Sequence, residues 1–348
     1  MLRISGSKLS DEFLGMVKQM LTAQDVDVSA FTARACREGG NNLVFEIGLG
    51  SGQLLAKKYY RSSQDPRDRL GAEWAFITYA RALGLADVPA TIARDQEQGI
   101  GLYEFVDGRK LNRDEIAPSH VEAAAQFFLA LNGEQRLAGG ESLPVASEAC
   151  FSFAAHIDLI EHRLARLQAI DTTDDLSREA VSHVADLTGH WRGIRNAIEQ
   201  QARHLQFGLR DELPNTHRCL SPSDFGFHNA LVKPDGKVIF IDFEYSGWDD
   251  PAKMAADFFC QPQVPVPTKN FEAFLDQTMV FSTAADELKE RSRVLLPAQK
   301  VKWACIMLND FLPDAARRRQ FANPQADVTA RKRSQLDKTA AALNSLTN

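Results

Sequence analysis

The stretch from Cys219 to Phe259, CLSPSDFGFHNALVKPDGKVIFIDFEYSGWDDPAKMAADFF, decides the fold that the sequence predicts. It contains two short apolar runs, Ala230–Val232 and Val238–Ile241. The residues between them are Lys233-Pro234-Asp235-Gly236, and their Asp-Gly pair is typical of a tight hairpin turn. We therefore expect a β-hairpin at this point of the chain.

Three polar side chains stand at the ends of these runs, where a hairpin has no need of them. Asp224 and Asn229 precede the first run and Asp242 follows the second, so the folded hairpin brings all three to one edge. Carboxylate and amide oxygens are the ligands that Mg²⁺ prefers, and a further carboxylate can orient a nucleophile. The spacing predicts a magnesium site beside a catalytic carboxylate. Ordinary Asp and Asn residues in turns are the simpler alternative, which the spacing leaves open.

The order of these residues resembles the catalytic segment of the protein-kinase-like fold, and within it the aminoglycoside phosphotransferase and choline kinase family. That family carries a His-x-Asp-x-x-x-x-Asn loop, then Ile-Asp-aromatic-Glu, then Asp-Pro. The segments that fit are Asp224–Asn229, Ile241–Glu244 and Asp250-Pro251. Two positions depart from the pattern: Pro222 replaces the usual His, and Met254 stands where an Asp often follows Asp-Pro.

The resemblance implies a role for each residue of the segment. Asp224 would accept or orient the proton of an acceptor hydroxyl, and Asn229 and Asp242 would hold Mg²⁺ against the phosphates of ATP or GTP. His228, inside the loop, would orient it, contact a phosphate or simply pack. The implied fold is α+β and bilobal, with a small β-rich N-terminal lobe and a larger, mainly helical C-terminal lobe.

The segment before residue 60 contains the residues that the resemblance would place at the nucleotide. Gly39-Gly40-Asn41-Asn42 predicts a turn, followed by strands over 43–47 and 53–60. No Gly-x-x-x-x-Gly-Lys-Ser/Thr loop occurs, and a strand-like run stands where a dinucleotide-binding motif would begin a helix, so both of those nucleotide-binding folds are excluded. The resemblance implies that the backbone of the glycine turn approaches the nucleotide phosphates.

A lysine on the second of these strands would contact the α- and β-phosphates, and Glu73, on a helix expected over about 66–83, would hold that lysine. Alternation along a strand puts Lys57 and Lys58 on opposite faces, so the spacing leaves the choice open. The family's pattern of a lysine before a basic residue and two aromatics favours Lys57.

The run Gly101–Gly108 resembles the link between the two lobes. In that comparison the backbone of Glu104, Phe105 and Val106 would meet the nucleotide base. We therefore expect a nucleotide-binding lobe over 1–104 and a helical lobe over 105–348, which would hold the catalytic segment 219–259 and the acceptor site. Helical periodicity recurs in the second part, with helices expected over 179–205, 301–308 and 329–346.

Composition limits the classes of partner. The net charge of −6 over 348 residues argues against nucleic acid or an anionic membrane as a partner. The five cysteines are scattered without metal-ligand spacing, and no apolar leader or membrane-length segment is present, so we expect a cytoplasmic protein. The basic clusters Arg317–Arg319 and Arg331–Arg333 are expected to be solvated helix faces.

The function predicted is that of a small-molecule kinase. Asp249-Asp250-Pro251 follows Asp242 so closely that no activation segment fits, which disfavours a protein kinase. A catalytically inactive nucleotide-binding regulator is the alternative, because Pro222 replaces a bracing His. Glu244, Asp249, Asp250 and Asp257 are expected to form a negative rim suited to an amino sugar or amino alcohol acceptor, and neutral sugars stay open.

Overall fold

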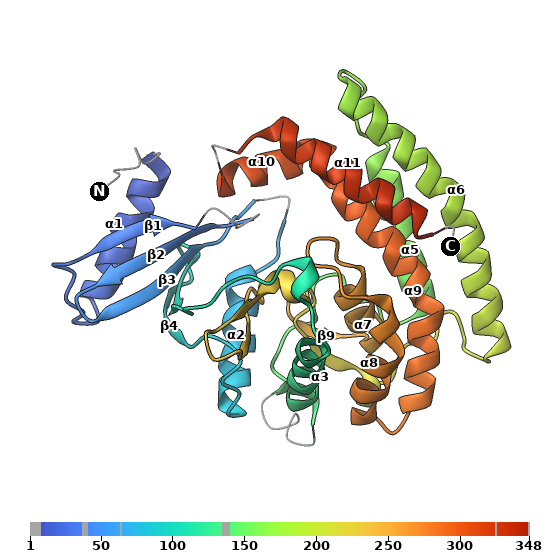
Figure 1. The fold of residues 1–348 in the computed structure, drawn as a ribbon, viewed down its shortest axis with the longest axis horizontal. Coiled ribbons are helices and arrows are strands. Elements are labelled where there is room, and N and C mark those ends of the chain that lie inside the picture. The colour runs from blue at the N-terminus through green and yellow to red at the C-terminus, as the bar shows by residue number, and fades with distance from the viewer. Residues whose placement is uncertain (1–7, 37–40, 63–64, 134–139, 324–325, 347–348) are drawn as a thin grey trace.

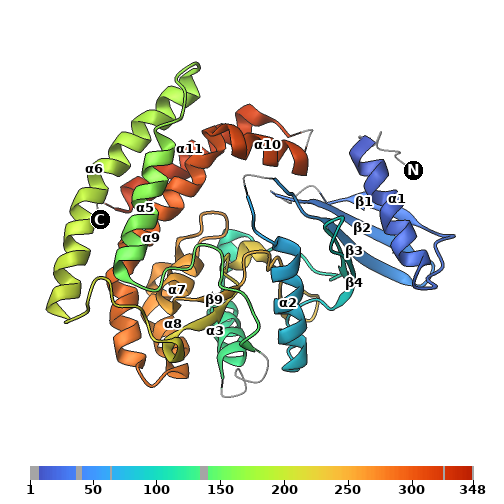
Figure 2. The same ribbon diagram turned by 180° about the vertical axis from the view of Figure 1, so that it is seen from behind.

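The computed structural model describes residues 8–36, 41–62, 65–133, 140–323 and 326–346. An antiparallel sheet lies at one end of the molecule and a larger helical body at the other (Figure 1). The two C-terminal helices arch from the helical body back towards the sheet, as both views show (Figure 2). The expected α+β arrangement, a sheet followed by a mainly helical region, is confirmed.

The N-terminal sheet has five strands in the order β1-β2-β3-β5-β4, and all neighbours are antiparallel. Helix α1 covers one face with a stripe of Phe13, Val17 and Leu21, which packs against the buried residues of the strands. This stripe follows the helical period, so burial of apolar side chains fixes the helix on the sheet. The bounds of these elements are α1 (Lys8–Thr22), β1 (Thr32–Ala35), β2 (Leu43–Leu49), β3 (Gly52–Lys58), β4 (Thr91–Asp95) and β5 (Ile100–Glu104).

Helix α2 (Arg69–Ala82) lies between the sheet and the helical body (Figure 1). Asp68 caps it, accepting a hydrogen bond from Gly71 N at 3.0 Å. The cap satisfies one of the donors that a helix leaves free at its start. The helix buries Glu73 on its inner face, 4% exposed, so this carboxylate requires partners from other elements.

The helical body contains two apolar cores. One joins α2, α3, α7 and α8 to the hairpin of segment 219–259, and the other joins α5, α6, α9 and α11. The bounds are α3 (Pro118–Asn132), α5 (Phe153–Leu167), α6 (Asp175–His204), α7 (Pro251–Cys260), α8 (Phe271–Thr278), α9 (Ala285–Leu308), α10 (Pro313–Ala322) and α11 (Val328–Asn344).

The segment 219–259 forms the expected hairpin. Strands β7 (Ala230–Val232) and β8 (Val238–Phe240) pair in antiparallel register. Gly236, with φ +85°, closes the turn by donating its N–H to the carbonyl of Lys233 at 2.9 Å. Glycine adopts this backbone region without the clash that a Cβ causes. A second pair, β6 (Cys219–Ser221) with β9 (Gly247–Asp249), holds the two ends of the segment together.

Helix α9 is longer than the sequence predicted. It begins at Ala285, whereas the expected helix covered only 301–308. The additional turns include Pro297, a residue that locally disfavours a helix interior. The structure accommodates Pro297 inside the helix, which packs against α5, α6, α7 and α11. Tertiary packing therefore overrides the local preference of proline.

Candidate active site

The hairpin brings its polar ends together. Ile241 N donates to the carbonyl of Asn229 at 2.9 Å, so the residue after β8 is tied to the residue before β7. Asn229 Nδ2 in turn donates to the backbone oxygen of Asp224 at 3.0 Å and to its Oδ2 at 3.2 Å. Asp224, Asn229 and Asp242 thus lie at one edge, as their spacing predicted.

His228 fixes the other oxygen of Asp224. Its Nε2 lies 3.0 Å from Asp224 Oδ1, and Lys110 Nζ donates to the His228 carbonyl at 2.5 Å. Burial opposes the ionised form of Asp224, but the charge and hydrogen bond of His228, together with Asn229, outweigh it and lower the pKa of this carboxyl. Asp224 is therefore an ionised, oriented carboxylate at neutral pH.

Two residues of the site have a left-handed backbone conformation. Asp242 has φ +67° and Ser223, beside Asp224, has φ +66°. Side chains other than glycine rarely adopt this region, and such residues concentrate at functional sites. The conformation is maintained on both sides of the site by the hairpin and by hydrogen bonds of Ser223.

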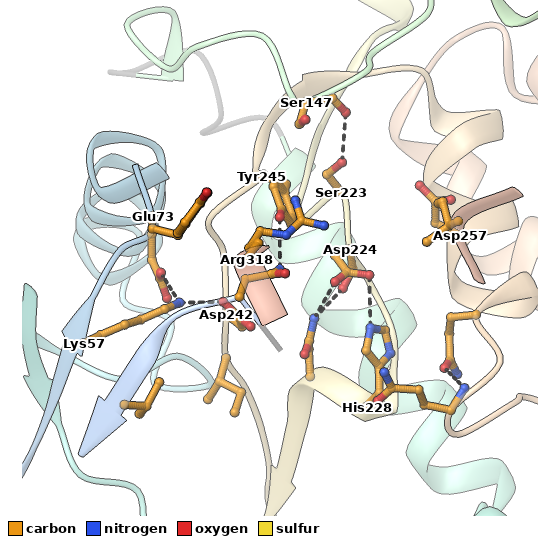
Figure 3. A pocket seen from close by; sticks show the side chains of 18 of the residues that line it. Lys57, Glu73, Ser147, Ser223, Asp224, His228, Asp242, Tyr245, Asp257 and Arg318 are labelled. Carbon is orange, nitrogen blue, oxygen red and sulfur yellow. Dashed lines mark hydrogen bonds and ion pairs between the residues drawn. The ribbon is translucent and has the colours of Figure 1, made fainter. Parts of the chain in front are cut away.

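Lys57 of β3 reaches across to the hairpin. Its Nζ lies 2.6 Å from Glu73 Oε2 and 2.5 Å from Asp242 Oδ1, with the lysine side chain 6% exposed (Figure 3). Burial opposes its charge, but the carboxylates of Asp242 and Glu73 prevail and raise the pKa of Lys57 well above its usual value. Lys58 points the other way and donates to the carbonyl of Gln98 at 3.1 Å. Lys57 is the lysine that faces the site.

Two tyrosines complete the surroundings of Glu73. Tyr59 OH donates to Glu73 Oε2 at 2.5 Å and lies 2.7 Å from Tyr103 OH. Glu73 Oε1 accepts from Phe243 N, the residue after Asp242, at 3.3 Å. Glu73 therefore connects α2 to β3 and to the hairpin at once. Tyr59 is one of the two aromatics in the pattern that favoured Lys57, but the sequence did not indicate that it and Tyr103 would surround Glu73.

The glycine turn is described only in part. Gly39 and Gly40 lie outside the described residues. Asn41 Nδ2 donates to Glu244 Oε1 at 3.0 Å and to Tyr245 OH at 3.1 Å, and Asn42 Nδ2 donates to Glu244 Oε2 at 2.7 Å. The two asparagine side chains thus join the sheet to the segment that follows Asp242.

The expected link between lobes lies on the cavity wall. Glu104, Phe105 and Val106 all line it. The Glu104 carboxylate accepts from Ala90 N at 2.9 Å, and Glu104 N donates to the Ala90 carbonyl at 2.9 Å. These bonds fix β5 where it leaves the sheet, and the next two residues adjoin the cavity.

A cavity of about 1620 Å³ lies between the sheet and the helical body. Lys57, Glu73, Asp224, Asn229 and Asp242 all line it. Figure 3 shows Lys57 and Glu73 on one side, Asp242 in the middle and Asp224 with His228 beyond it. The volume exceeds what one small ligand needs, so the cavity has room for a nucleotide and a second substrate.

Asn229 and Asp242 each present an oxygen atom that a magnesium ion could use. Among the described residues, nothing donates a hydrogen bond to Asn229 Oδ1 or to the second carboxylate oxygen of Asp242. Mg²⁺ is usually bound by one or two such protein oxygens together with substrate phosphates and water. The described residues contain no group of three or more His, Cys, Asp or Glu side chains arranged for a metal, so protein ligands alone would not complete the shell. Asn229 and Asp242 fit a magnesium ion shared with phosphates.

The loop of Asp224 is braced without the usual histidine. Lys253 Nζ donates to Ser223 Oγ at 2.9 Å, and it lies 2.6 Å from Asp249 Oδ2 and 3.2 Å from Asp257 Oδ2. Lys253 is 2% exposed, and sequence reasoning missed it. The spacing of four residues from each aspartate was the available signal, because such residues are neighbours on a helix.

The expected negative rim does not form. Asp249 and Asp250 are fully buried and Asp257 is 2% exposed. Asp250 pairs with Arg291 at 2.6 Å, and Asp257 pairs with Lys302 and with Lys253. The fourth residue, Glu244, is 3% exposed and holds Asn41 and Asn42. That expectation was wrong because buried carboxylates take cationic or amide partners from elsewhere in the fold.

The basic cluster on α10 is not a solvated face as a whole. Arg317, Arg318 and Arg319 all line the cavity, and Figure 3 shows Arg318 beside Tyr245. Phe321 packs edge-on against Tyr60, with ring centroids 5.3 Å apart, and so fixes α10 near the sheet. The expectation was wrong because packing at the far end of the helix turns it over the cavity.

No helix in the described part of the chain combines the length and the apolar character that crossing a membrane requires. All five cysteines are free thiols. No curated protein matches this sequence significantly.

Solved structures share the fold at low sequence identity. An ethanolamine kinase from Plasmodium vivax superposes with a TM-score of 0.58 at 14% identity, over 95% of this chain and 86% of that one. A choline kinase from Cryptosporidium parvum gives 0.54 at 14%, over 97% and 100%. An aminoglycoside phosphotransferase with bound ADP gives 0.52 at 12%, over 94% and 98%. The protein-kinase-like fold is confirmed.

A family model also matches the sequence itself. It covers residues 32–279, which is more than half of the chain and includes both the sheet and the hairpin. The chain belongs to the phosphotransferase enzyme family.

Proposed function

We propose that this protein transfers the γ-phosphoryl group of ATP, or of GTP, to a hydroxyl group of a small molecule. One observation carries the proposal: Lys57, Asp242, Asn229 and Asp224, from distant parts of the chain, converge on one wall of a cavity with room for two substrates. This is the set of groups that phosphoryl transfer requires, namely a phosphate cation, oxygen ligands and a base.

In the reaction, the acceptor oxygen attacks the γ-phosphorus and forms the new O–P bond. The bond between the γ-phosphorus and the β–γ bridging oxygen breaks, and ADP leaves with that oxygen. Asp224, ionised and fixed by His228 and Asn229, takes the proton of the acceptor hydroxyl. Its low pKa makes it a weak base, so its main contribution is to position the hydroxyl for in-line attack.

Lys57 supplies positive charge for the phosphates that are not transferred. Glu73 and Tyr59 hold the Lys57 end of β3 in place, so the ammonium is oriented before substrate binds. Mg²⁺, held by Asn229 and Asp242, would neutralise phosphate charge as it develops. We assign residues 1–104 to a nucleotide-binding lobe. The backbone of Glu104–Val106 would contact the base of the nucleotide. The ADP bound by the related phosphotransferase supports a nucleotide in this cavity.

Nucleotide binding and transfer are tested separately. The melting temperature of wild type, Asp242→Asn and Asp224→Asn is measured with ATP or GTP, with and without Mg²⁺. A ligand that binds the folded state raises the melting temperature by mass action. We expect a Mg²⁺-dependent rise in wild type and in Asp224→Asn, and its loss in Asp242→Asn. Acceptor-dependent ADP release should disappear in both variants.

The outcomes separate the two candidate functions. No stabilisation of wild type by either nucleotide at millimolar concentration overturns the kinase proposal. Stabilisation without turnover of any acceptor favours the inactive nucleotide-binding regulator. That alternative was raised because Pro222 replaces the usual histidine. Acceptor-dependent ADP release that is lost in Asp224→Asn excludes the inactive regulator.

A further inference from the structure

The cavity has a strongly basic wall on the side of the helical body. Helices α5, α9 and α10 supply it, and its cationic side chains are Arg163, Arg166, Lys302, Arg317, Arg318 and Arg319. Figure 3 shows Asp257, the partner of Lys302, on the side of Asp224 that faces away from Lys57. Lys302 therefore lies on the side of Asp224 away from Lys57, where an acceptor would bind, and the other cations of the wall line the same cavity.

The carboxylates of this wall are already matched with cations. Glu148 pairs with Arg163, and Asp257 pairs with Lys302 and Lys253 and also accepts from Trp303 Nε1 at 2.9 Å. Burial opposes ionisation of Glu148, but Arg163 and the two lysines outweigh it and lower the pKa of Glu148. Each of these carboxylates already has a partner, so neither offers the bare negative charge that an ammonium ligand requires.

Two arginines carry positive charge that the described residues do not match. Arg318 Nε is buried and has no acceptor for its N–H among the described residues, none of which forms a hydrogen bond or ion pair with the Arg318 side chain. Figure 3 shows this side chain beside Tyr245, directed into the pocket between Asp242 and Asp224. Arg166, exposed in the last turn of α5, lines the same cavity and likewise has no ion-pair partner among the described residues.

A buried guanidinium N–H without an acceptor is costly, and a bound anion removes that cost. The planar donor fork of arginine matches a carboxylate or phosphate in particular. We propose that the acceptor is an anionic hydroxyl compound, whose carboxylate or phosphate group binds Arg318 and Arg166 while its hydroxyl lies at Asp224. This inference rests on the proposed function and narrows its substrate class to acids. It replaces the amine-bearing acceptor that the sequence favoured.

The experiment compares acceptors that differ in charge alone. ADP release from ATP–Mg²⁺ is measured with D-glycerate against glycerol, D-gluconate against sorbitol, and glycerol 3-phosphate against glycerol, with choline and streptomycin as cationic acceptors. Binding of each compound is also measured by thermal shift in the presence of ADP–Mg²⁺, so that a poor substrate still gives a readout. We expect an anionic member to exceed its neutral counterpart at least about tenfold in kcat/KM.

Variants test the two arginines. Arg166→Gln and Arg318→Gln should raise the KM for the anionic acceptor by about 10- to 100-fold, the usual value of a charge-assisted hydrogen bond, and should leave the Kd for ATP unchanged. Arg192→Gln, at an exposed position on α6 outside the cavity lining, is the matched control and should leave both constants unchanged. Melting temperatures without ligand verify that all three variants fold.

Each result is decisive. A preference for choline, streptomycin or the neutral compounds overturns the inference, as does failure of every anionic probe both to bind and to react. An effect of Arg318→Gln on ATP affinity with an unchanged acceptor KM assigns that residue to the nucleotide instead and also overturns it. If wild type binds neither ATP nor GTP in the presence of Mg²⁺, the proposed function itself is overturned, which is a different result from those above.

Discussion

The ammonium of Lys57 lies 2.5 Å from Oδ1 of Asp242, although 185 residues separate them in the chain. This contact joins the centre of the sheet to the end of the hairpin. Glu73 holds the same ammonium at 2.6 Å, so one buried cation lies between carboxylates from two other elements.

Lys57→Met should abolish most phosphoryl transfer, whereas Lys58→Met should not. We expect kcat/KM to fall by about 100-fold or more when Lys57 is lost, since a preoriented charge at the reacting phosphates is removed. Among the described residues, the Lys58 ammonium donates a hydrogen bond to the Gln98 carbonyl, away from the site, so its loss should change kcat/KM by less than about threefold.

A folding control accompanies this comparison. Removing one member of a buried pair costs about 3–5 kcal/mol, so Lys57→Met is also measured by urea unfolding. The double variant Lys57→Met/Glu73→Gln, which leaves less uncompensated charge, should recover part of that stability without recovering activity. Equal activity losses for the two lysine variants would contradict the assignment.

His228 should set the acid limit of activity. It helps to lower the pKa of Asp224, so in wild type this carboxylate stays ionised down to below its usual value of 3.8. A base acts above its pKa and is lost as pH falls through it. In His228→Leu the effect of burial, which raises the pKa of Asp224, is no longer opposed by His228. The acid limb of kcat/KM should therefore move to higher pH.

His228→Gln is the matched variant, because an amide retains a hydrogen-bond donor for Asp224 but no charge. Its acid limb should lie between those of wild type and His228→Leu when kcat/KM is measured from about pH 4 to 8. Superimposable profiles for all three proteins would show that His228 does not tune Asp224.

Lys253 should be worth far more to stability than an exposed lysine. Its side chain is 2% exposed and pairs with Asp249 and Asp257, so Lys253→Met should reduce the free energy of unfolding by about 3–5 kcal/mol. Lys289→Met removes a surface pair with Asp276, at 2.8 Å, and should lower the free energy of unfolding far less, because solvent screens exposed pairs. Urea unfolding at pH 7 measures both.

The loss of unfolding free energy in Lys253→Met should depend on pH. Burial raises the pKa of Asp249 to about 6 even beside Lys253, and without the lysine it rises further. A carboxyl whose folded pKa is raised supports the fold in its neutral form, and this support disappears as pH rises through that pKa. The loss should therefore be larger at about pH 8 than at about pH 5. A loss that is the same at both values would contradict the raised pKa.

His156 should make the fold sensitive to acid. It is fully buried between Asp250, 3.0 Å from Nε2, and Gln299, 3.0 Å from Nδ1. Burial lowers the pKa of His156 below 6.5, despite the contact with Asp250. Below pH 6.5 the unfolded chain binds more protons than the folded one, so the free energy of unfolding falls as pH decreases, by up to about 1.4 kcal/mol per pH unit.

His156→Gln can keep both hydrogen bonds and does not titrate, so its unfolding free energy should fall less steeply below pH 6.5 than that of wild type. His204→Gln, at the exposed end of α6, serves as the control and should retain the wild-type slope. Identical slopes in wild type and His156→Gln would rule out this source of acid sensitivity.

Much of the catalytic segment could be predicted because its signals are local. Lys233–Gly236 specifies a tight turn, the apolar runs on either side specify strands, and the hairpin then brings Asn229 and Asp242 together. Lys57 could be chosen over Lys58 only with the family pattern, since alternation divides the two between faces without saying which face is inside.

The basic wall could not be predicted in the same way. A charged residue in a sequence carries no sign of whether it will be solvated, paired or turned into a cavity. Arg318 faces the cavity because Phe321 anchors α10 against Tyr60, a contact across 261 positions of the chain. Helix packing over such distances leaves no local pattern.

The sequence by itself determined the hairpin and the residues at its ends, because backbone geometry and short-range periodicity govern them, and its motifs carried the resemblance that implied the fold. Only the tertiary structure decided the character of the acceptor side. It buried Asp249, Asp250 and Asp257 against Lys253, Arg291 and Lys302, and it left Arg166 and Arg318 facing the cavity. The physical reason is that burial makes charges pair, and the partners available depend on which distant helices pack together.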